Sequence, residues 1–190
     1  MDTIFRKRCN WSKNDALYMQ YHDEEWGVPI YNDQKIFECL ILEMFQSGLS
    51  WITILRKREQ FRTAFDNFDY IKIANYSEKK LKSLQLNSGI IRNTSKIKAA
   101  KNNAIAFIEI KKEFLSFSKY IWDFVDGKPI HNNFINTYEI PAKTTLSDKI
   151  SFDLKNRGFK YIGSTIIYAF MQSIGMVNDH TTNCFRHIEV

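Results

Sequence analysis

Glycine and proline are scarce in this chain of 190 residues, which contains only seven glycines and three prolines. No stretch is rich in glycine, serine or proline, so the sequence shows neither a flexible linker nor an internal repeat. A length of this order suits a single domain with a substantial core. We therefore expect one domain over residues 1–190, built in two lobes.

Long apolar runs and paired cysteines are missing as well. The longest apolar stretches fall well short of the roughly 18 residues that a membrane span requires. Residues 1–10 carry basic side chains without the apolar run of a secretory signal. The three cysteines cannot all pair, and their spacing matches no disulfide framework. These absences lead us to expect a cytoplasmic, reducing location, no membrane partner and a monomeric protein.

What the chain does have is apolar, aromatic and basic residues. Apolar residues make up 44% of it, which excludes an intrinsically disordered chain. Aromatic residues reach 15%, including four tryptophans, and this is a stronger clue than charge. The formal net charge of +6 permits an anionic partner such as a nucleic acid without proving one.

Helical periodicity dominates, and no strand with convincing alternation is visible, so the sequence predicts an all-α fold. The first helix runs from a cap at Asn14 or Asp15 to about Asp23. Residues 122–143 are turn-rich and leave room for short extended pieces. The remaining helices are expected over residues 33–47, 53–65, 69–74, 77–87, 93–114, 148–157 and 164–174, with Ser147 capping the helix at 148.

The helix that begins near Asp33 contains the first candidate site. Positions 36–45 are apolar almost all round, interrupted by Glu38 and Glu43. A helix that is apolar on every face is buried, and a buried carboxylate is costly without a partner. Gln46, a glycine and Trp51 follow, which together indicate a pocket wall. The alternative is a core helix whose glutamate caps a neighbouring helix or meets an arginine.

The second candidate site is the turn of residues 88–92, within a predicted helix–hairpin–helix element at about 78–114. The backbone N–H groups at the start of its second helix could hold a phosphate oxygen. Such an element holds a DNA strand without reading its sequence, and we expect contacts from Gly89, Arg92 and Lys96. The alternative is an ordinary helical hairpin with a solvated basic face. The basic residues around the turn are Lys79, Lys80, Lys82, Arg92, Lys96, Lys98 and Lys101.

Two pairs of metal-ligating side chains lie near the two ends of the chain. Cys9 and His22 are near the start, and His180 and Cys184 form an H-x3-C pair near the end. Two thiolates and two imidazoles make a closed tetrahedral sphere for Zn²⁺, which is typical of a structural rather than a catalytic site. Such a site would join the N- and C-terminal segments and stabilise the fold.

Spacing alone does not bring these two pairs together. A satisfied surface histidine and a buried cysteine are the alternative, and His131 and His187 are further imidazoles available to a metal. Cys39 lies in the helix that begins near Asp33, where we expect it to pack as an ordinary apolar side chain.

Several stretches together resemble one family, the 3-methyladenine DNA glycosylase I family. They are RCNW (8–11), YMQYHDEEWGVP (18–29), LEMFQSGLSWITILRKRE (42–59), GIIRN and KI (89–93, 96–97), RGFKYIGSTIIYAFMQ (157–172) and MVNDH (176–180). The match extends over essentially the whole chain. Two departures are Thr94-Ser95, where an Arg-Gly pair is common in the family, and Ser173-Ile174 after the MQ.

The resemblance implies an all-helical member of the helix–hairpin–helix glycosylase superfamily, with the chain forming a single catalytic domain. Such an enzyme is a monofunctional N-glycosylase that flips 3-methyladenine out of double-stranded, alkylated DNA and excises it by hydrolysis in base excision repair. The free base is the product. The resemblance also implies one structural Zn²⁺ ion on the family's ligand positions, and this favours the metal site over its alternative. Those positions are Cys9, His22, His180 and Cys184.

The resemblance also assigns roles within the pocket. Glu43 matches the family's base-recognising carboxylate, and whether it is also catalytic stays open. Leu49 lies where the family pushes a residue into the DNA stack. Gln46 belongs to the same pocket wall. The family's aromatic lining falls on Trp11, Tyr18, Tyr21 and Trp51.

These residue types suit the expected chemistry. N3-methylation makes adenine cationic, so aromatic faces gain about 0.5–2 kcal/mol of cation–π attraction, and an ionised Glu43 gains Coulomb attraction. We find no equivalent of the catalytic aspartate that many relatives place beyond the hairpin, because Asp123 and Asp126 lie in the turn-rich segment. Two other functions stay open: a non-catalytic, zinc-stapled DNA-binding sensor of alkylation, and a metal-dependent hydrolase that uses the His/Cys cluster.

Overall fold

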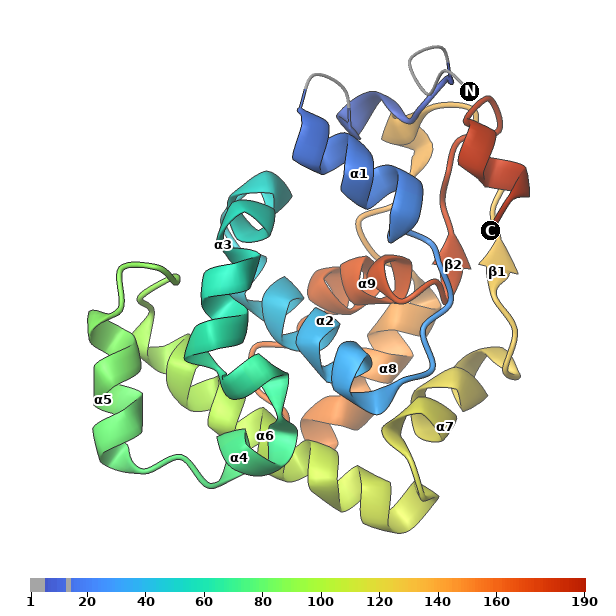
Figure 1. Ribbon diagram of the computed structural model, residues 1–190. Helices are drawn as coiled ribbons and strands as arrows, with labels where there is room; N and C mark the ends of the chain where they lie inside the picture. The colour runs from blue at the N-terminus through green and yellow to red at the C-terminus, as the bar shows by residue number, and fades with distance from the viewer. Residues whose placement is uncertain (1–5, 13–14) are drawn as a thin grey trace.

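The computed structural model describes residues 6–12 and 15–190 and confirms a mostly helical fold (Figure 1). No helix in this described part combines the length and apolar character that crossing a membrane would need. The helices are α1 (Ala16–Glu24), α2 (Asp33–Gln46), α3 (Trp51–Ala64), α4 (Tyr70–Ala74), α5 (Glu78–Leu86), α6 (Thr94–Phe114), α7 (Phe117–Trp122), α8 (Thr145–Asn156) and α9 (Ser164–Ser173). Short 3₁₀ turns are η2 (Asn10–Ser12), η3 (Asp66–Phe68), η4 (Asp123–Val125), η5 (Thr137–Glu139) and η6 (Phe185–Ile188).

Side-chain caps set the starts of several helices. Asp15 accepts the N–H of Tyr18 at 3.0 Å and caps α1, whereas Asn14, the other expected cap, lies outside the described residues. The prediction of Ser147 as the cap of α8 is wrong. Thr144 is the cap, and Ser147 returns the bond from the third helical position in a reciprocal capping box, so the helix begins earlier than expected.

A short pair of parallel strands qualifies the all-α prediction. β1 (Ile130–His131) pairs with β2 (Val177–Asn178) in the register Ile130↔Val177 and His131↔Asn178. Strands of two residues are too short to show alternation. β1 lies in the turn-rich segment 122–143, which left room for short extended pieces, whereas β2 lies outside it and was not expected. The pair fixes the loop before α8 to the segment that follows α9.

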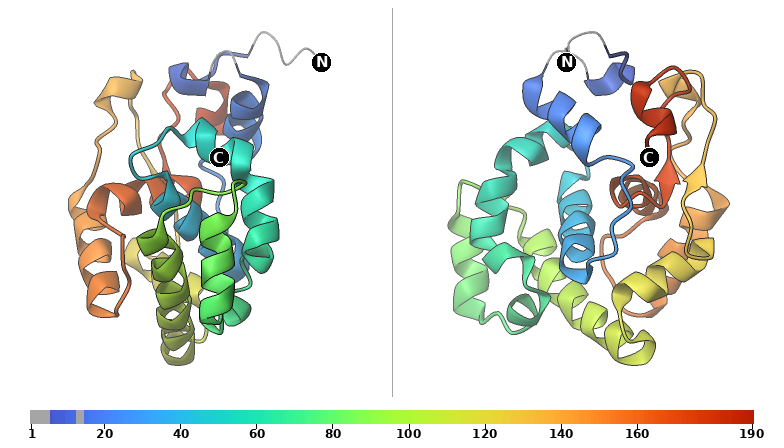
Figure 2. Two further views of the ribbon diagram at one scale, coloured as in Figure 1. Left: turned by 90° about the vertical axis from the view of Figure 1, so that its left-hand side faces the viewer. Right: turned by 45° about the vertical axis from the view of Figure 1, so that its right-hand side comes forward.

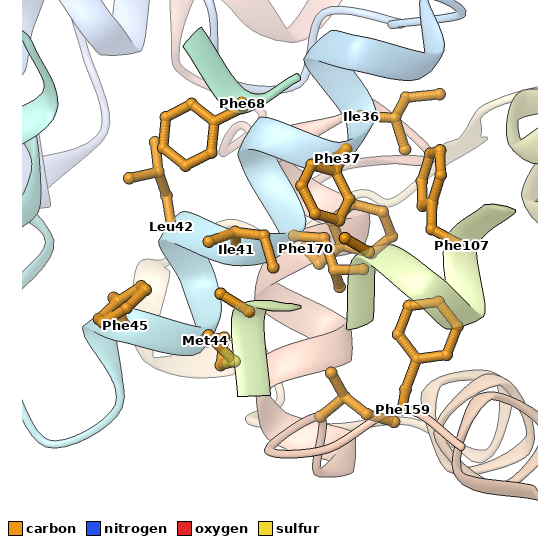
Figure 3. Packing of buried hydrophobic residues seen from close by; sticks show 14 of the residues in the cluster. Ile36, Phe37, Ile41, Leu42, Met44, Phe45, Phe68, Phe107, Phe159 and Phe170 are labelled. Atoms are coloured by element: carbon orange, nitrogen blue, oxygen red, sulfur yellow. The ribbon is translucent and has the colours of Figure 1, made fainter. Parts of the chain in front are cut away.

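Helix α2 is the centre of the fold. It contacts α3, α6, α7 and α9, and Figures 1 and 2 show α3–α5 on one side of it, α7–α9 on the other and α6 running below it. Figure 3 shows its apolar side chains meeting phenylalanines from the surrounding elements. One continuous buried cluster includes side chains from α2 through α9, so both sides of the molecule share a single core. Its largest fully buried members include Phe37, Phe45, Phe68, Phe107, Phe159 and Phe170.

A second, smaller cluster joins the two ends of the chain. It contains Cys9, Tyr21, Trp26, Leu55 and Cys184, all buried. The backbone N–H of Phe185 donates to the carbonyl of Lys7 at 3.0 Å, which holds the C-terminal segment beside the N-terminal one. Trp51 packs against this cluster and against the main core. The N-terminal segment is therefore positioned by packing against the C-terminal segment and α3.

Candidate active site

The two glutamates of α2 have opposite environments. Glu38 accepts a hydrogen bond from Nε of Arg62 at 2.7 Å, so it meets an arginine as in the alternative interpretation of this helix. Glu43 is only 4% exposed, and its Oε2 has no hydrogen-bond partner among the described residues. Burial raises the pKa of Glu43 to about 8. A carboxylate left unpartnered in the interior costs stability, so Glu43 is suited to meeting a ligand.

Glu43 opens into a cavity of about 390 Å³, which lies within the usual size range of small-molecule sites. The structure brings to this cavity all six residues predicted to bind substrate: Trp11, Tyr18, Tyr21, Glu43, Gln46 and Trp51. They come from three separate segments, namely the N-terminal turn η2, helix α1 and the α2–α3 region. The cavity is therefore assembled by the tertiary fold.

Aromatic rings make up one side of the cavity. The ring centroids of Trp11 and Tyr18 are 4.9 Å apart, and those of Tyr21 and Trp51 are 5.4 Å apart. Trp26 also lines the cavity and contacts Trp11 edge-on at 4.9 Å, a role that the sequence analysis missed. The indole N–H of Trp51 is buried without a hydrogen-bond partner among the described residues. Aromatic faces beside an unpartnered carboxylate can hold a flat, positively charged ring.

The remaining walls were not predicted. One comes from the loop around η5, in the turn-rich segment, which carried no sequence signal for a site. The other is a face of α9, whose members recur at a spacing of three or four residues as one helical face does. These residues are Thr137, Ile140, Pro141, Ala142, Thr165, Tyr168, Ala169 and Gln172.

The Gly48-Leu49 turn lies where the cavity continues toward the surface. Gly48 has φ of +85°, which favours glycine, and it turns the chain sharply after α2. Leu49 is 40% exposed beside a second hollow. This hollow shares Glu43 with the cavity and is also lined by Lys143 and Gly163. An exposed leucine at this position is consistent with the predicted contact to stacked bases, which stays a prediction.

Lys96 does not have the solvent-facing position that a phosphate contact requires, so that prediction needs correction. Its side chain is 7% exposed, and Nζ donates to the carbonyls of Phe45 at 3.1 Å and Ser47 at 2.9 Å. An ammonium group at these orphan carbonyls satisfies the C-terminal end of α2. Burial lowers the pKa of Lys96. This lysine holds the Glu43 helix in place.

The Gly89 turn between α5 and α6 is also used internally. The N–H of Gly89 donates to Oδ1 of Asn87 at 2.8 Å, so this group is not free for a phosphate. A Cβ on Gly89 would lie 3.0 Å from Cβ of Gln60, and the close approach to α3 explains the glycine. Arg92 is exposed beside it, and its contact with DNA stays a prediction.

The four predicted metal ligands lie together. Cys9, His22, His180 and Cys184 are all buried, and their ligand atoms lie within 4.8 Å of one another. Sγ of Cys184 is 3.4 Å from Nε2 of His22 and 3.5 Å from Nδ1 of His180. The edges of a tetrahedral zinc site with two sulfur and two nitrogen ligands are about 3.3–3.8 Å. The donor set and its geometry therefore fit a Zn²⁺ ion.

The second ring nitrogen of each histidine is also engaged. Nδ1 of His22 lies 2.8 Å from a carboxylate oxygen of Asp23, and Nε2 of His180 lies 2.9 Å from the carbonyl of Trp26. Such contacts orient imidazoles toward a metal. The hydrogen bond between the two thiol groups lowers the pKa of Cys184 and raises the pKa of Cys9, so Cys184 is the thiolate of this pair. His131 and His187 are not members of this group.

Comparison with known proteins places this site in context. Residues 11–187 match the family model described as methyladenine glycosylase. The chain is 44% identical to DNA-3-methyladenine glycosylase 1 of Escherichia coli K12, over 94% of this chain and 95% of the relative. It is 46% identical to DNA-3-methyladenine glycosylase of Haemophilus influenzae, over 93% and 96% of the two chains.

Solved structures show the same fold. A crystal structure of 3-methyladenine DNA glycosylase I superposes with a TM-score of 0.92 at 47% identity, covering 94% of this chain and 98% of the other. A structure of the Staphylococcus aureus 3-methyladenine DNA glycosylase I, described as the structural basis of 3-methyladenine recognition, gives 0.91 at 31% identity. It covers 94% of this chain and 95% of its own.

The environment of Glu43 predicts a pH-dependent gain of stability for Glu43→Gln. The folded pKa of about 8 lies above the unfolded value, so the folded chain retains a proton that the unfolded chain loses. The free energy of unfolding of the unchanged protein therefore falls as the pH rises through this window, whereas glutamine does not titrate. We expect Glu43→Gln to be more stable at pH 9 by several kcal/mol, since one pKa unit corresponds to about 1.4 kcal/mol.

Urea unfolding without ligand at pH 5 and pH 9 measures this effect. The matched control is Glu38→Gln, which removes one of the two carboxylates bonded to Arg62 and should bring no gain at high pH. A stability difference between Glu43→Gln and the unchanged protein that stays constant between the two pH values would contradict the assignment.

Proposed function

The chain belongs to the methyladenine glycosylase family, and we propose that it excises 3-methyladenine from alkylated, double-stranded DNA by hydrolysis of the N-glycosyl bond. The observation that carries this conclusion is the unpartnered Glu43 carboxylate inside a cavity lined by aromatic rings. The relatives named above carry this activity in their names. The reaction is a step of DNA repair.

Recognition begins with extrusion of the damaged nucleotide. A base inside the duplex cannot reach the cavity, so it has to be flipped out at a cost of a few kcal/mol, which is lower for a damaged base. Leu49, exposed beside the cavity mouth, fills the gap that the base leaves in the stack. The cationic ring then stacks in the aromatic cavity, where cation–π attraction contributes about 0.5–2 kcal/mol.

Glu43 supplies the selectivity for a charged base. Its pKa of about 8 in the free protein falls when a cation enters, because the charge of the ligand favours the carboxylate. The ionised carboxylate attracts the base and accepts a hydrogen bond from its exocyclic amine. An uncharged adenine offers no such compensation for ionising a buried acid. The cavity therefore prefers the cationic lesion, because only a positively charged base offsets the free-energy cost of ionising the buried Glu43.

Bond cleavage requires little acid assistance. The electron pair of the N-glycosyl bond leaves with the base, which departs as neutral 3-methyladenine. Water adds to the oxocarbenium-like sugar carbon and loses a proton. Glu43 is the carboxylate among the described residues that line the cavity, so any electrostatic support for the sugar cation comes from it. Asp123 and Asp126 do not line the cavity.

Two helical hairpins flank the mouth of the cavity, and we assign both to the DNA backbone. The α5–α6 element at 78–114, a helix–hairpin–helix in our proposal, adjoins the Leu49 turn through Lys96 and presents Arg92 to solvent. The α8–α9 hairpin borders the same mouth more directly, because Gly163 and the exposed Lys143 line the hollow beside Leu49. Backbone contacts of this kind position a duplex without reading its sequence.

The cluster of Cys9, His22, His180 and Cys184 holds one structural Zn²⁺ ion in our proposal. Four protein ligands close a tetrahedral sphere, which leaves no position for a water or a substrate. This closure disfavours the metal-dependent hydrolase considered above. The ion would lock η2 and α1, which carry Trp11 and Tyr18, to the C-terminal segment. It thereby supports the aromatic wall without taking part in the reaction.

Release of free base tests the proposed activity. Incubation with N-methylated duplex DNA should liberate 3-methyladenine, detected by chromatography. Folded protein that binds such DNA without releasing base would instead favour the non-catalytic sensor. Glu43→Gln should weaken the binding of free 3-methyladenine by about tenfold, since one mispaired buried polar group costs about 1–3 kcal/mol. Glu38→Gln should leave it unchanged, and equal affinities for all three proteins would remove Glu43 from the pocket.

Metal analysis tests the zinc proposal. The purified protein should contain about one zinc per chain, and Cys184→Ser should lose it together with several degrees of melting temperature. The matched control is Cys39→Ser, which replaces a cysteine outside the cluster and should retain the zinc. Zinc at trace level in the unchanged protein, or full zinc content in Cys184→Ser, would overturn the assignment.

A further inference from the structure

Asp179 is a second buried carboxylate close to the cavity, and both of its oxygens accept hydrogen bonds. It follows β2 and is 1% exposed. Its Oδ1 accepts a hydrogen bond from Nδ2 of Asn132 at 2.7 Å. Its Oδ2 accepts two more, from the hydroxyl of Tyr168 at 2.8 Å and from Nε2 of Gln172 at 2.7 Å. Unlike Oε2 of Glu43, both oxygens of this carboxylate have hydrogen-bond partners within the protein.

Two of these three donors line the base cavity. Tyr168 and Gln172 are four residues apart on α9, so they share the helical face that lines the cavity. Asp179 itself does not line it, and neither does Asn132. Asp179 therefore reaches the cavity through the two side chains whose polar ends it holds.

The bonds to Asp179 determine what those side chains can offer a ligand. The Tyr168 hydroxyl has a single proton, and that proton is committed to Asp179, so its oxygen can act toward the cavity only as an acceptor. The Gln172 amide is held with its nitrogen toward Asp179, which commits one of its two N–H groups and turns its Oε1 away from the carboxylate. Rotating the amide would place two acceptors against each other. Burial, and then the charge of Asp179, raise the pKa of Tyr168, so the phenol keeps its proton.

We propose that Asp179 is a positioning residue that fixes the α9 wall as a hydrogen-bond acceptor and so makes the cavity prefer 3-methyladenine over 3-methylguanine. The inference rests on the proposed function. Adenine carries an amino group at position 6, which donates hydrogen bonds, whereas guanine carries a carbonyl oxygen there. A carbonyl that faces Tyr168 and Gln172 would meet acceptors on the α9 wall and remain unpaired there, which disfavours the guanine lesion.

The experiment compares the dissociation constants of free 3-methyladenine and free 3-methylguanine for the full-length protein, measured by tryptophan fluorescence or calorimetry. Asp179→Ala frees the Tyr168 hydroxyl and the Gln172 amide to turn donors toward the cavity. The dissociation constant of 3-methylguanine divided by that of 3-methyladenine measures the preference for the adenine lesion. In Asp179→Ala this ratio should fall about tenfold, as expected when one buried polar group is no longer mispaired with the guanine carbonyl.

Two further variants separate positioning from a general structural effect. Asp179→Asn should retain the preference of the unchanged protein, because its amide oxygen can still accept from Tyr168 and Gln172 once Asn132 reverses its own amide. Asn132→Ala removes the third donor, which does not reach the cavity, and should also leave the ratio unchanged. Melting temperature and metal content are followed throughout, since Asp179 precedes His180.

The outcomes are distinct. If Asp179→Ala weakens the binding of both bases by the same factor, the role of Asp179 is only structural and the proposal fails. If Asp179→Ala does not fold, Tyr168→Phe gives the answer: loss of this acceptor should lower the ratio at least threefold, and an unchanged ratio overturns the proposal. If the unchanged protein binds no 3-methyladenine, the proposed function fails before any variant of Asp179 is considered.

Discussion

The candidate site depends on keeping a carboxylate in the last turn of an apolar helix without giving it a partner. Helix α2 has Ile36, Phe37, Leu40, Ile41, Met44 and Phe45 with no exposed surface, so Glu43 cannot turn toward water without dismantling the core. Lys96 satisfies carbonyls at the C-terminal end of the helix and fixes that end in place. The resulting cost to stability is tolerated because the same isolation gives the site its attraction for a cation.

Three interior or half-buried carboxylates show how partners divide structural from functional groups. Glu38 is neutralised by Arg62, and Asp179 is filled by three neutral donors. Glu43 has neither kind of partner on its Oε2. A raised pKa caused by burial alone, in a cavity, therefore distinguishes Glu43 from two acids whose hydrogen bonds are made within the protein.

Much of this arrangement could be predicted from the sequence where chemistry or periodicity is local. Apolar periodicity gave the helices, and the odd glutamate in an apolar run gave Glu43. The family resemblance grouped the four candidate metal ligands, whereas spacing alone did not bring the two pairs together. Roles that depend on a distant partner were missed. Lys96 looked like a surface base because its carbonyl acceptors lie on another helix, and the η5 loop has no periodic pattern that would mark it as a wall.

The cavity is assembled from distant segments, so its shape depends on how the N- and C-terminal segments are joined. Trp11 and Tyr18 pack against the small cluster that contains Cys9 and Cys184, and in our proposal a Zn²⁺ ion on Cys9, His22, His180 and Cys184 would fix these two segments to each other. The C-terminal segment that contains His180 and Cys184 also carries Asp179, which orients the α9 wall. The C-terminal segment thus contributes to positioning both the aromatic wall and the polar wall around Glu43. A displacement of this segment would therefore weaken cation recognition and hydrogen-bond selectivity together.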